Sequence, residues 1–388
     1  MFARTIRRAA SSRAAATTFP TPAAMTMPRC SSSPRPTTTM TTSPTIRTMA
    51  SSSSSARSPK LSSRETIPST RIRILRSVDS VRAWRKPHQV DQRIVSLVPT
   101  MGALHEGHLS LIRAAARESH EVVVSIYVNP AQFGVHEDLD SYPKTWETDC
   151  AALAQLDREL ADDGANLGRL SAVFAPTTND MYPSGFPGQA VDSKGSFVNM
   201  TPVGELFNVV QPDRVYFGQK DVQQTVVIRR MVRDFLMPIE VQIGATTREA
   251  DGLALSSRNV YLGERRRRVA TVLNRALKAA EGQYSNGRGA RDRDYILGAA
   301  RKVMTDTLAE QMALAPEKRV MFEVDYISLS DPETMEEISE IDPKKGGILS
   351  GAVKMLPVEA PRPGEDLGHS GGPAVRLIDN IILKPSST

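Results

Sequence analysis

The chain has 388 residues, of which 40% are hydrophobic and 24% charged, a balance typical of a soluble globular protein with one large domain or two ordinary ones. No apolar run is long enough to span a membrane, and two cysteines, Cys30 and Cys150, are too few for a disulfide framework or a zinc site. This low cysteine count is typical of a reducing compartment.

The first 64 residues contain ten basic residues and no acidic residue, and the rest is mostly Ser, Thr, Ala and Pro. Such a segment buries too little apolar surface to offset its ordering entropy, so we expect a disordered leader over residues 1–70. Since the whole chain carries +6 and the first 64 residues carry +10, residues 65–388 carry −4. The basic pI therefore does not describe the folded part, and we expect neither a nucleic-acid nor a membrane partner.

The N-terminal stretch MFARTIRRAASSRAAATTF is rich in Arg and Ser and free of acids, which is typical of a mitochondrial transit peptide. A low-complexity leader, or upstream sequence that precedes a start at Met49, explains the same composition. We therefore expect a cytoplasmic or mitochondrial protein, not a secreted one.

Strands and helices alternate through the first part of the folded region. We expect strands at 93–99, 121–128, 170–176, 214–218 and 239–245, and helices at 107–119, 147–160, 204–210 and 222–236. This alternation indicates an α/β fold with a doubly wound parallel sheet over residues 71–247. Ligands of such sheets bind at the carboxyl ends of the strands.

The pattern changes after Arg248. Two helical segments, 268–282 and 295–312, precede two strands, 322–329 and 374–383. We interpret residues 248–388 as a second, smaller α+β domain, interrupted by a Gly/Pro-rich loop near 345–374.

Two histidines follow the first core strand, within the segment VPTMGALHEGHLS (98–110). His105 and His108 lie three positions apart at the start of a helix, so both rings lie on one side of its first turn. Free N–H groups and positive potential at a helix N-terminus attract phosphate, and Gly107 lets the backbone approach a ligand closely. Exposed polar residues at a helix cap are the alternative, but the place directly after the first strand favours phosphate contact.

Polar side chains also follow the other strands. They are Asn129 and Gln132 after the second strand, Lys220, Asp221 and Gln224 after the fourth, and Ser256, Ser257 and Arg258 after the fifth. A surface turn or a helix cap explains each cluster alone, but the carboxyl ends of parallel strands meet at one edge, so we expect a shared site. The chain contains neither GxxxxGK[ST] nor GxGxxG, which makes a P-loop enzyme and a Rossmann dehydrogenase weak alternatives.

Taken together, these stretches resemble the pantothenate synthetase, or pantoate–β-alanine ligase, family. The matching stretches are VPTMGALHEGHLSLI, YVNPAQFG, DLDSYPKT, VFAPT, MYP, QPDRVYFGQKDVQQTVVIRRMVRD, TREADGLALSSRNVYL and RLIDNI. The resemblance covers residues 72–345 with one gap, and then 374–383, while HxGH alone is shared with other nucleotidyltransferases. It implies an HxGH nucleotidyltransferase-like Rossmann fold followed by the smaller α+β domain.

The resemblance implies an ATP-dependent condensation of pantoate with β-alanine. The pantoate carboxylate would attack the α-phosphate of ATP, giving pantoyl adenylate and pyrophosphate, and the β-alanine amine would then displace AMP. The first step needs alignment of two anions and cancellation of their charge rather than a protein nucleophile, because pantoate is ionised at pH 7. The resemblance also implies a homodimer, and Mg²⁺ would accompany ATP, held mainly by phosphates, so that no protein ligand is assigned.

The resemblance assigns site residues position by position. The catalytic groups are His105, His108, Lys220 and Arg258, with His108 the better candidate proton donor. The residues expected to bind ATP are Met101, Gly102, His105, Gly107, His108, Gly218, Gln219, Lys220, Asp221, Thr247, Leu255, Ser256, Ser257 and Arg258. The residues expected to bind substrate are Asn129, Gln132 and Gln224, with Met101 closing over pantoate.

On the same resemblance, about twenty residues are missing between Val198 and Gly204, where this chain has only NMTPV. We expect a following helix cut to about two turns, looser packing beside the strand RVYFG, and loss of an arginine-bearing wall of the site. An impaired homologue therefore remains an alternative to the full ligase. A nucleotidyltransferase that stops after the first transfer is the other.

Overall fold

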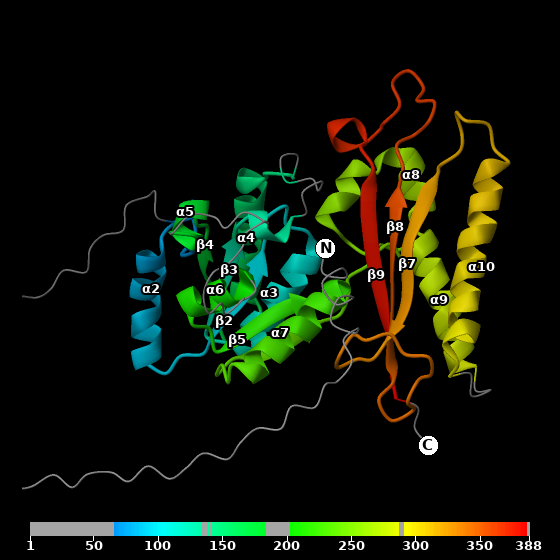
Figure 1. Cartoon of the computed structure of the whole chain (residues 1–388). Helices are drawn as coiled ribbons and strands as arrows, with labels where there is room; N and C mark the ends of the chain where they lie inside the picture. The colour runs from blue at the N-terminus through cyan, green and yellow to red at the C-terminus, as the bar shows by residue number, and fades with distance from the viewer. Residues whose placement is uncertain (1–65, 134–138, 140–141, 184–201, 287–290, 386–388) are drawn as a thin grey trace, which may run out of the picture. The chain divides into compact units, whose positions relative to one another are not determined.

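Two β-sheets organise the chain in the computed structural model, which describes residues 66–133, 139, 142–183, 202–286 and 291–385. One sheet has six strands and the other has three (Figure 1). The predicted α/β class, with a parallel sheet and a smaller α+β part, is confirmed.

The six-stranded sheet is parallel at every pairing and has the order β1-β4-β3-β2-β5-β6. Its strands are β1 (Arg73–Leu75), β2 (Val95–Thr100), β3 (Glu121–Ile126), β4 (Arg169–Phe174), β5 (Arg214–Gly218) and β6 (Glu240–Gly244). The order runs one way from β2 to β4 and the other way from β5 to β6. The reversal between β2 and β5 is the place where a doubly wound sheet forms a ligand-binding crevice.

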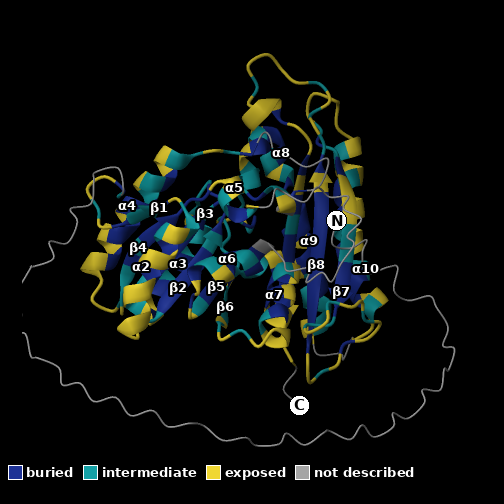
Figure 2. Cartoon of the chain, turned by 60° about the vertical axis from the view of Figure 1, so that its left-hand side comes forward, coloured by how far each residue is buried: buried dark blue, intermediate teal, exposed yellow. Residues whose placement is uncertain are grey.

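Helices cover both faces of this sheet. They are α2 (Val78–Val90), α3 (Glu106–Glu118), α4 (Trp146–Asp162), α5 (Thr178–Met181), α6 (Pro202–Val210) and α7 (Val222–Asp234). In β3, Val123 joins one apolar cluster while Val122 and Val124 join another, because successive side chains of a strand point to opposite faces. Both faces are therefore buried, which explains the run of β-branched residues in this strand. Figure 2 shows the strands largely buried.

The three-stranded sheet is antiparallel, with the order β7-β8-β9. Its strands are β7 (Phe322–Ser330), β8 (Gly347–Met355) and β9 (Val375–Leu383), and the helices before it are α8 (Gly263–Val269), α9 (Val272–Ser285) and α10 (Arg293–Met312). A third apolar cluster joins α9 and α10 to this sheet. The predicted order of two helical segments before the strands is confirmed.

The loop expected near 345–374 is wrong in its first part, because Gly347–Met355 forms β8, the central strand of the antiparallel sheet. Gly351 in this strand reflects packing rather than a turn. A Cβ atom on Gly351 would lie 2.9 Å from Cδ1 of Leu273 in α9, so the helix approaches the strand too closely for a side chain.

The boundary of the predicted leader is also wrong at its end, since residues 66–70 belong to the folded part. Ile67 is 2% exposed, and its N–H donates to the carbonyl of Ile72. Residues 1–65 lie outside the described residues. The predicted division between residues 247 and 248 follows β6 and stays a prediction, because the described residues on its two sides cluster as one unit. In the part of the chain that the structure describes, no helix is long and apolar enough to cross a membrane.

Helix α6 is nine residues long, as short as expected after the missing segment. Its apolar face is nevertheless closely packed. Leu206, Phe207 and Val210 are buried, and the ring of Phe207 meets that of Phe217 in β5 edge-to-face, with centroids 6.4 Å apart. The looser packing expected here is therefore not what this helix shows. Residues 184–201, which hold most of the predicted gap, lie outside the described residues.

Candidate active site

The predicted site residues follow the carboxyl ends of four neighbouring strands, β3, β2, β5 and β6. The segment with His105 and His108 follows β2, and the one with Lys220 follows β5, so they flank the reversal of strand order. Parallel pairing brings these ends to one edge of the sheet.

The two histidines form the first turn of α3. His105 is the N-cap residue, and the two imidazole rings lie with their centroids 4.1 Å apart and their planes at 33°. Nδ1 of His105 accepts a hydrogen bond from the Gly107 N–H at 3.1 Å, and Nδ1 of His108 accepts one from the His105 N–H at 3.4 Å. The pair is thus a capping box built from imidazoles.

These hydrogen bonds decide which nitrogen carries the proton in each neutral ring. Because each Nδ1 is an acceptor, a neutral ring carries its proton on Nε2. Burial, and then the charge of Lys220, lowers the pKa of His105 to about 4. Burial, and then the neighbouring His105 and Lys220, lowers the pKa of His108 to about 3. At pH 7 both rings are neutral hydrogen-bond donors through Nε2–H.

Gly107 leaves room for the imidazole of His105. A Cβ atom there would lie 2.8 Å from Cε1 and 2.9 Å from Nδ1 of His105, closer than real Cβ contacts. The space beside Gly107 is therefore occupied by the ring of His105. Its expected contact with ATP stays a prediction.

The loop between β2 and α3 is held by a carboxylate that the sequence analysis missed. Asp149 of α4 is 2% exposed and accepts hydrogen bonds from the N–H groups of Ala103 at 3.0 Å and Leu104 at 2.8 Å. Gly102 and Ala103 both have positive φ, 83° and 50°, which a loop rarely keeps without such support. Asp149 therefore sets the path by which the chain reaches His105.

Lys220 lies in a single 3-10 turn, Gln219–Asp221 (η3), between β5 and α7. Its Nζ is 3.5 Å from Oδ2 of Asp221. Apart from the two neighbours of Gly218, which ends β5, no described residue lies within 4 Å of the place where its Cβ would lie. The fold does not require glycine at this position, so the open space suits the close approach of a nucleotide.

The segment after β6 returns to the loop of the histidines. Ser257 donates a hydrogen bond from Oγ to the carbonyl of Ala103 at 3.2 Å, and the Ser110 and Thr247 hydroxyls are 3.4 Å apart. Oγ of Ser256 accepts from the Arg258 N–H at 3.3 Å. Leu255 closes the preceding hairpin through its N–H to Thr247. The two predicted phosphate-binding segments are therefore in direct contact.

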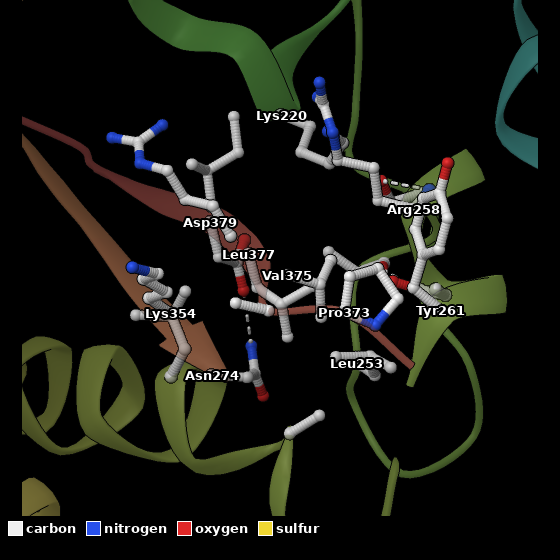
Figure 3. A pocket seen from close by; sticks show the side chains of 18 residues that line it. Lys220, Leu253, Arg258, Tyr261, Asn274, Lys354, Pro373, Val375, Leu377 and Asp379 are labelled. Atoms are coloured by element: carbon white, nitrogen blue, oxygen red, sulfur yellow. Dashed lines mark hydrogen bonds between the residues drawn. The ribbon is translucent and has the colours of Figure 1, made fainter. Parts of the chain in front are cut away.

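A cavity of about 410 Å³ brings Lys220, Ser256 and Arg258 together. Its opposite wall comes from α9 and β9 and includes Asn274 and Asp379. Figure 3 shows Lys220 and Arg258 on one side, and the hydrogen bond from Asn274 to Asp379 across from them. The two histidines are not among its lining residues, so this cavity is one side of the predicted site.

Two further residues that the sequence analysis did not assign are Asp379 and Asn380 of β9. Asp379 is 4% exposed and accepts two hydrogen bonds from Arg248, at 2.6 and 2.8 Å. Asn380 contacts the turn that carries Lys220. The signal available in the sequence was a pair of polar residues inside the apolar strand RLIDNIIL.

The predicted substrate residues are placed less completely. Asn129 is buried, and its Oδ1 accepts hydrogen bonds from the Ala131 N–H at 3.0 Å and the Tyr182 hydroxyl at 2.9 Å. The backbone of Gln132 ends the short helix η2 (Pro130–Gln132), and its side chain lies outside what is described. Gln224 and Met101 are half-buried, in α7 and directly after β2.

Comparisons with known proteins support one family. The model of the pantoate-beta-alanine ligase family matches residues 73–382. The pantothenate synthetase of Herpetosiphon aurantiacus is 38% identical over 324 residues, which are 80% of this chain and 100% of that protein. A crystal structure of pantothenate synthetase from Thermus thermophilus is 36% identical, with a TM-score of 0.59 over 81% of this chain and 100% of that one.

A more distant crystal structure is that of a pantoate-beta-alanine ligase from Francisella tularensis, complexed with beta-gamma ATP and beta-alanine. It is 23% identical, with a TM-score of 0.50 over 81% of this chain and 100% of that one, and it shows the likeness of fold alone. The family model and the relative of 38% identity decide the assignment that the motifs predicted. This chain belongs to the pantoate-beta-alanine ligase family.

Proposed function

We infer that the protein condenses pantoate with β-alanine in an ATP-dependent, AMP-forming reaction that passes through pantoyl adenylate. The observation that carries this function is the imidazole pair at the N-terminus of α3, next to Lys220 and at the reversal of strand order. Such an arrangement offers donors and positive charge to a phosphate chain.

In the first step, a pantoate carboxylate oxygen attacks the α-phosphorus and the bond to the β-phosphate oxygen breaks, releasing pyrophosphate. Both reactants are anions, so the barrier falls when their charges are cancelled and their atoms aligned. We assign this cancellation to Lys220 and Arg258. His105 and His108 donate hydrogen bonds from Nε2–H to the phosphates.

His108 remains our candidate for the proton donor. Its pKa of about 3 describes the protein without a bound anion. A triphosphate beside the rings adds negative charge, which raises the pKa of an imidazole. The proton is then gained as ATP binds, and it can pass to the departing pyrophosphate. In the second step the amine of β-alanine attacks the acyl carbon, and the bond to the AMP oxygen breaks.

We assign the ATP contacts to the segments that follow β2, β5 and β6, and the pantoate contacts to Gln132 and Gln224, with Asn129 beside them. Met101 closes over pantoate. Ser257 has a second role in this scheme, because its hydroxyl joins the loop after β6 to the loop after β2.

Magnesium fits this site as a companion of ATP. Among the described residues, no group of three or more His, Cys, Asp or Glu side chains is placed to hold a metal ion. We propose that Mg²⁺ is held by the phosphates, as is usual for this ion with nucleotides. It would supply further charge cancellation on the oxygens of the triphosphate.

We also propose a homodimer, on the family resemblance, and a cytoplasmic or mitochondrial location. Light scattering of the purified protein tests the first. A fluorescent fusion that carries residues 1–64, compared with one that lacks them, tests the second.

The function is tested by supplying substrates one at a time. ATP with pantoate should release pyrophosphate, and AMP should appear as free product only when β-alanine is added. A nucleotidyltransferase that stops after the first transfer would release pyrophosphate without any AMP that depends on β-alanine. No pyrophosphate under either condition would contradict the function.

A further inference from the structure

The side chain of Asn380 is hydrogen-bonded to the turn that carries Lys220. Its Nδ2 donates to two successive carbonyls, that of Gln219 at 2.9 Å and that of Lys220 at 2.8 Å. Its Oδ1 accepts a hydrogen bond from Nε2 of Gln219 at 3.1 Å. Asn380 is 1% exposed, so these hydrogen bonds are made away from solvent. Breaking them would leave buried polar groups without partners, which is costly.

Strand β9, which contains Asn380, is itself held in place. Successive residues of a strand point to opposite sides, and Asp379 points toward Arg248 and Asn274. The Arg248–Asp379 pair is bidentate, and such pairs fix direction as well as distance. Pairing with β8 and the ion pair both hold β9 in place. The backbone from which the Asn380 side chain extends is therefore fixed.

The two carbonyls belong to the peptide units on either side of Lys220. Their orientation sets the direction in which the Lys220 side chain leaves the turn, since only two soft backbone dihedrals per residue connect them. A single 3-10 turn has few hydrogen bonds of its own with which to hold that direction.

We propose that Asn380 is a positioning residue for Lys220, which keeps the ammonium group aimed at the phosphate during adenylate formation. This inference rests on the proposed role of Lys220 in the first step. Asn380 acts through the two carbonyls and does not itself touch substrate.

The test is the rate of pyrophosphate release from ATP and pantoate in Asn380→Ala. A displacement of a reacting group by about 1 Å costs about a hundredfold in rate, so kcat should fall about a hundredfold while KM for pantoate stays unchanged. Tyr284→Phe is the matched control. It removes the 2.9 Å hydrogen bond from the Tyr284 hydroxyl to the Lys384 carbonyl just beyond the same strand, and it should leave kcat unchanged.

A double-mutant cycle with Lys220→Ala separates positioning from a structural effect. If Asn380 acts through Lys220, then Asn380→Ala should cause no further loss of kcat in the Lys220→Ala background. An equal loss in both backgrounds would overturn the proposal, as would a normal kcat in Asn380→Ala when Lys220→Ala is impaired. A normal rate in Lys220→Ala would instead refute the role proposed for the lysine.

Melting curves of each variant accompany the rates. If Asn380→Ala does not fold, Asn380→Ser serves in the same cycle, because its hydroxyl can hold a water that fills the space of the lost amide. The same outcomes then decide the proposal.

Discussion

Replacing Gly107 with alanine should separate catalysis from stability at the N-terminus of α3. The added Cβ would lie 2.8 Å from Cε1 and 2.9 Å from Nδ1 of His105, and 3.9 Å from the Cβ of Thr247. The methyl group cannot be accommodated without moving the imidazole. That movement breaks the hydrogen bond from the Gly107 N–H to Nδ1 and displaces the Nε2–H donor.

The stability and rate effects differ in size. Alanine is favoured over glycine within a helix by about 1 kcal/mol, and the lost hydrogen bond contributes about 0.5–1.5 kcal/mol, so the free energy of unfolding should change by about 1 kcal/mol or less. Loss of one donor to the charge that develops in the transition state costs about 3–4 kcal/mol, or about 10²–10³ in kcat.

The assay is pyrophosphate release from ATP and pantoate, together with urea unfolding. Gly298→Ala in α10 is the control, because in the described part of the chain nothing outside the backbone of this helix lies within 4 Å of its Cβ position. That variant should gain stability by about 1 kcal/mol and keep its rate. A normal rate in Gly107→Ala would show that the position of the His105 ring does not matter for the reaction, and would refute the role given to it.

Three further predictions follow from the same geometry. The pKa values of His105 and His108, about 4 and about 3, lie below the unfolded value of about 6.5, so the stability they contribute is complete above pH 6.5 and lost as the pH falls toward them. Between pH 7 and pH 5, urea unfolding should show a decrease in the free energy of unfolding of about 2 kcal/mol per imidazole. His108→Asn should make this decrease smaller. An unchanged pH dependence would contradict burial of a neutral ring. Gly218→Ala should raise KM for ATP at an unchanged melting temperature, since only the open side of β5 is filled, and an unaltered KM would place the nucleotide elsewhere. Asp149→Ala leaves two N–H groups without acceptors, so unfolding at pH 7 should become easier by about 3 kcal/mol; a change below about 1 kcal/mol would mean that the loop does not need this carboxylate.

The parallel sheet and the gathering of polar residues at its carboxyl edge were predictable because their signals are local. The strand at 214–218 coincides with β5, and the run EVVVSI forms β3 as expected. A histidine before a helical pattern, with glycine two residues later, marked the start of α3. These patterns need no knowledge of distant residues, since strand period and helix capping are set by neighbours in sequence.

The antiparallel sheet was harder, because its glycines have two explanations. Glycines near 345–374 indicate a loop when taken alone, yet Gly351 is the place where α9 packs against β8. Which explanation holds depends on Leu273, far away in the sequence. The short β1 and helix α2, between residues 73 and 90, were not predicted.

Among the residues that were not predicted, Asp149 and Asn380 escaped prediction for different reasons. Asp149 shares the inward stripe of α4 with Leu153 and Leu160, and an acid on an apolar stripe was a signal that went unused. Asn380 meets Lys220 across 160 residues of sequence, and no local pattern predicts such a contact. The side chains that we propose to touch substrate were therefore easier to predict than those that hold their segments in place.

The placement of Asn380 in β9 also bears on how the protein is made. Translation completes the strands of the parallel sheet, which end at Gly244, long before it reaches Val375–Leu383. The ribosome elongates the chain from its N-terminus. The turn with Lys220 therefore meets Asn380 only after the ninth strand has been made. On the positioning role that we propose for Asn380, synthesis itself thus leaves the direction of the Lys220 side chain unset until β9 has been made.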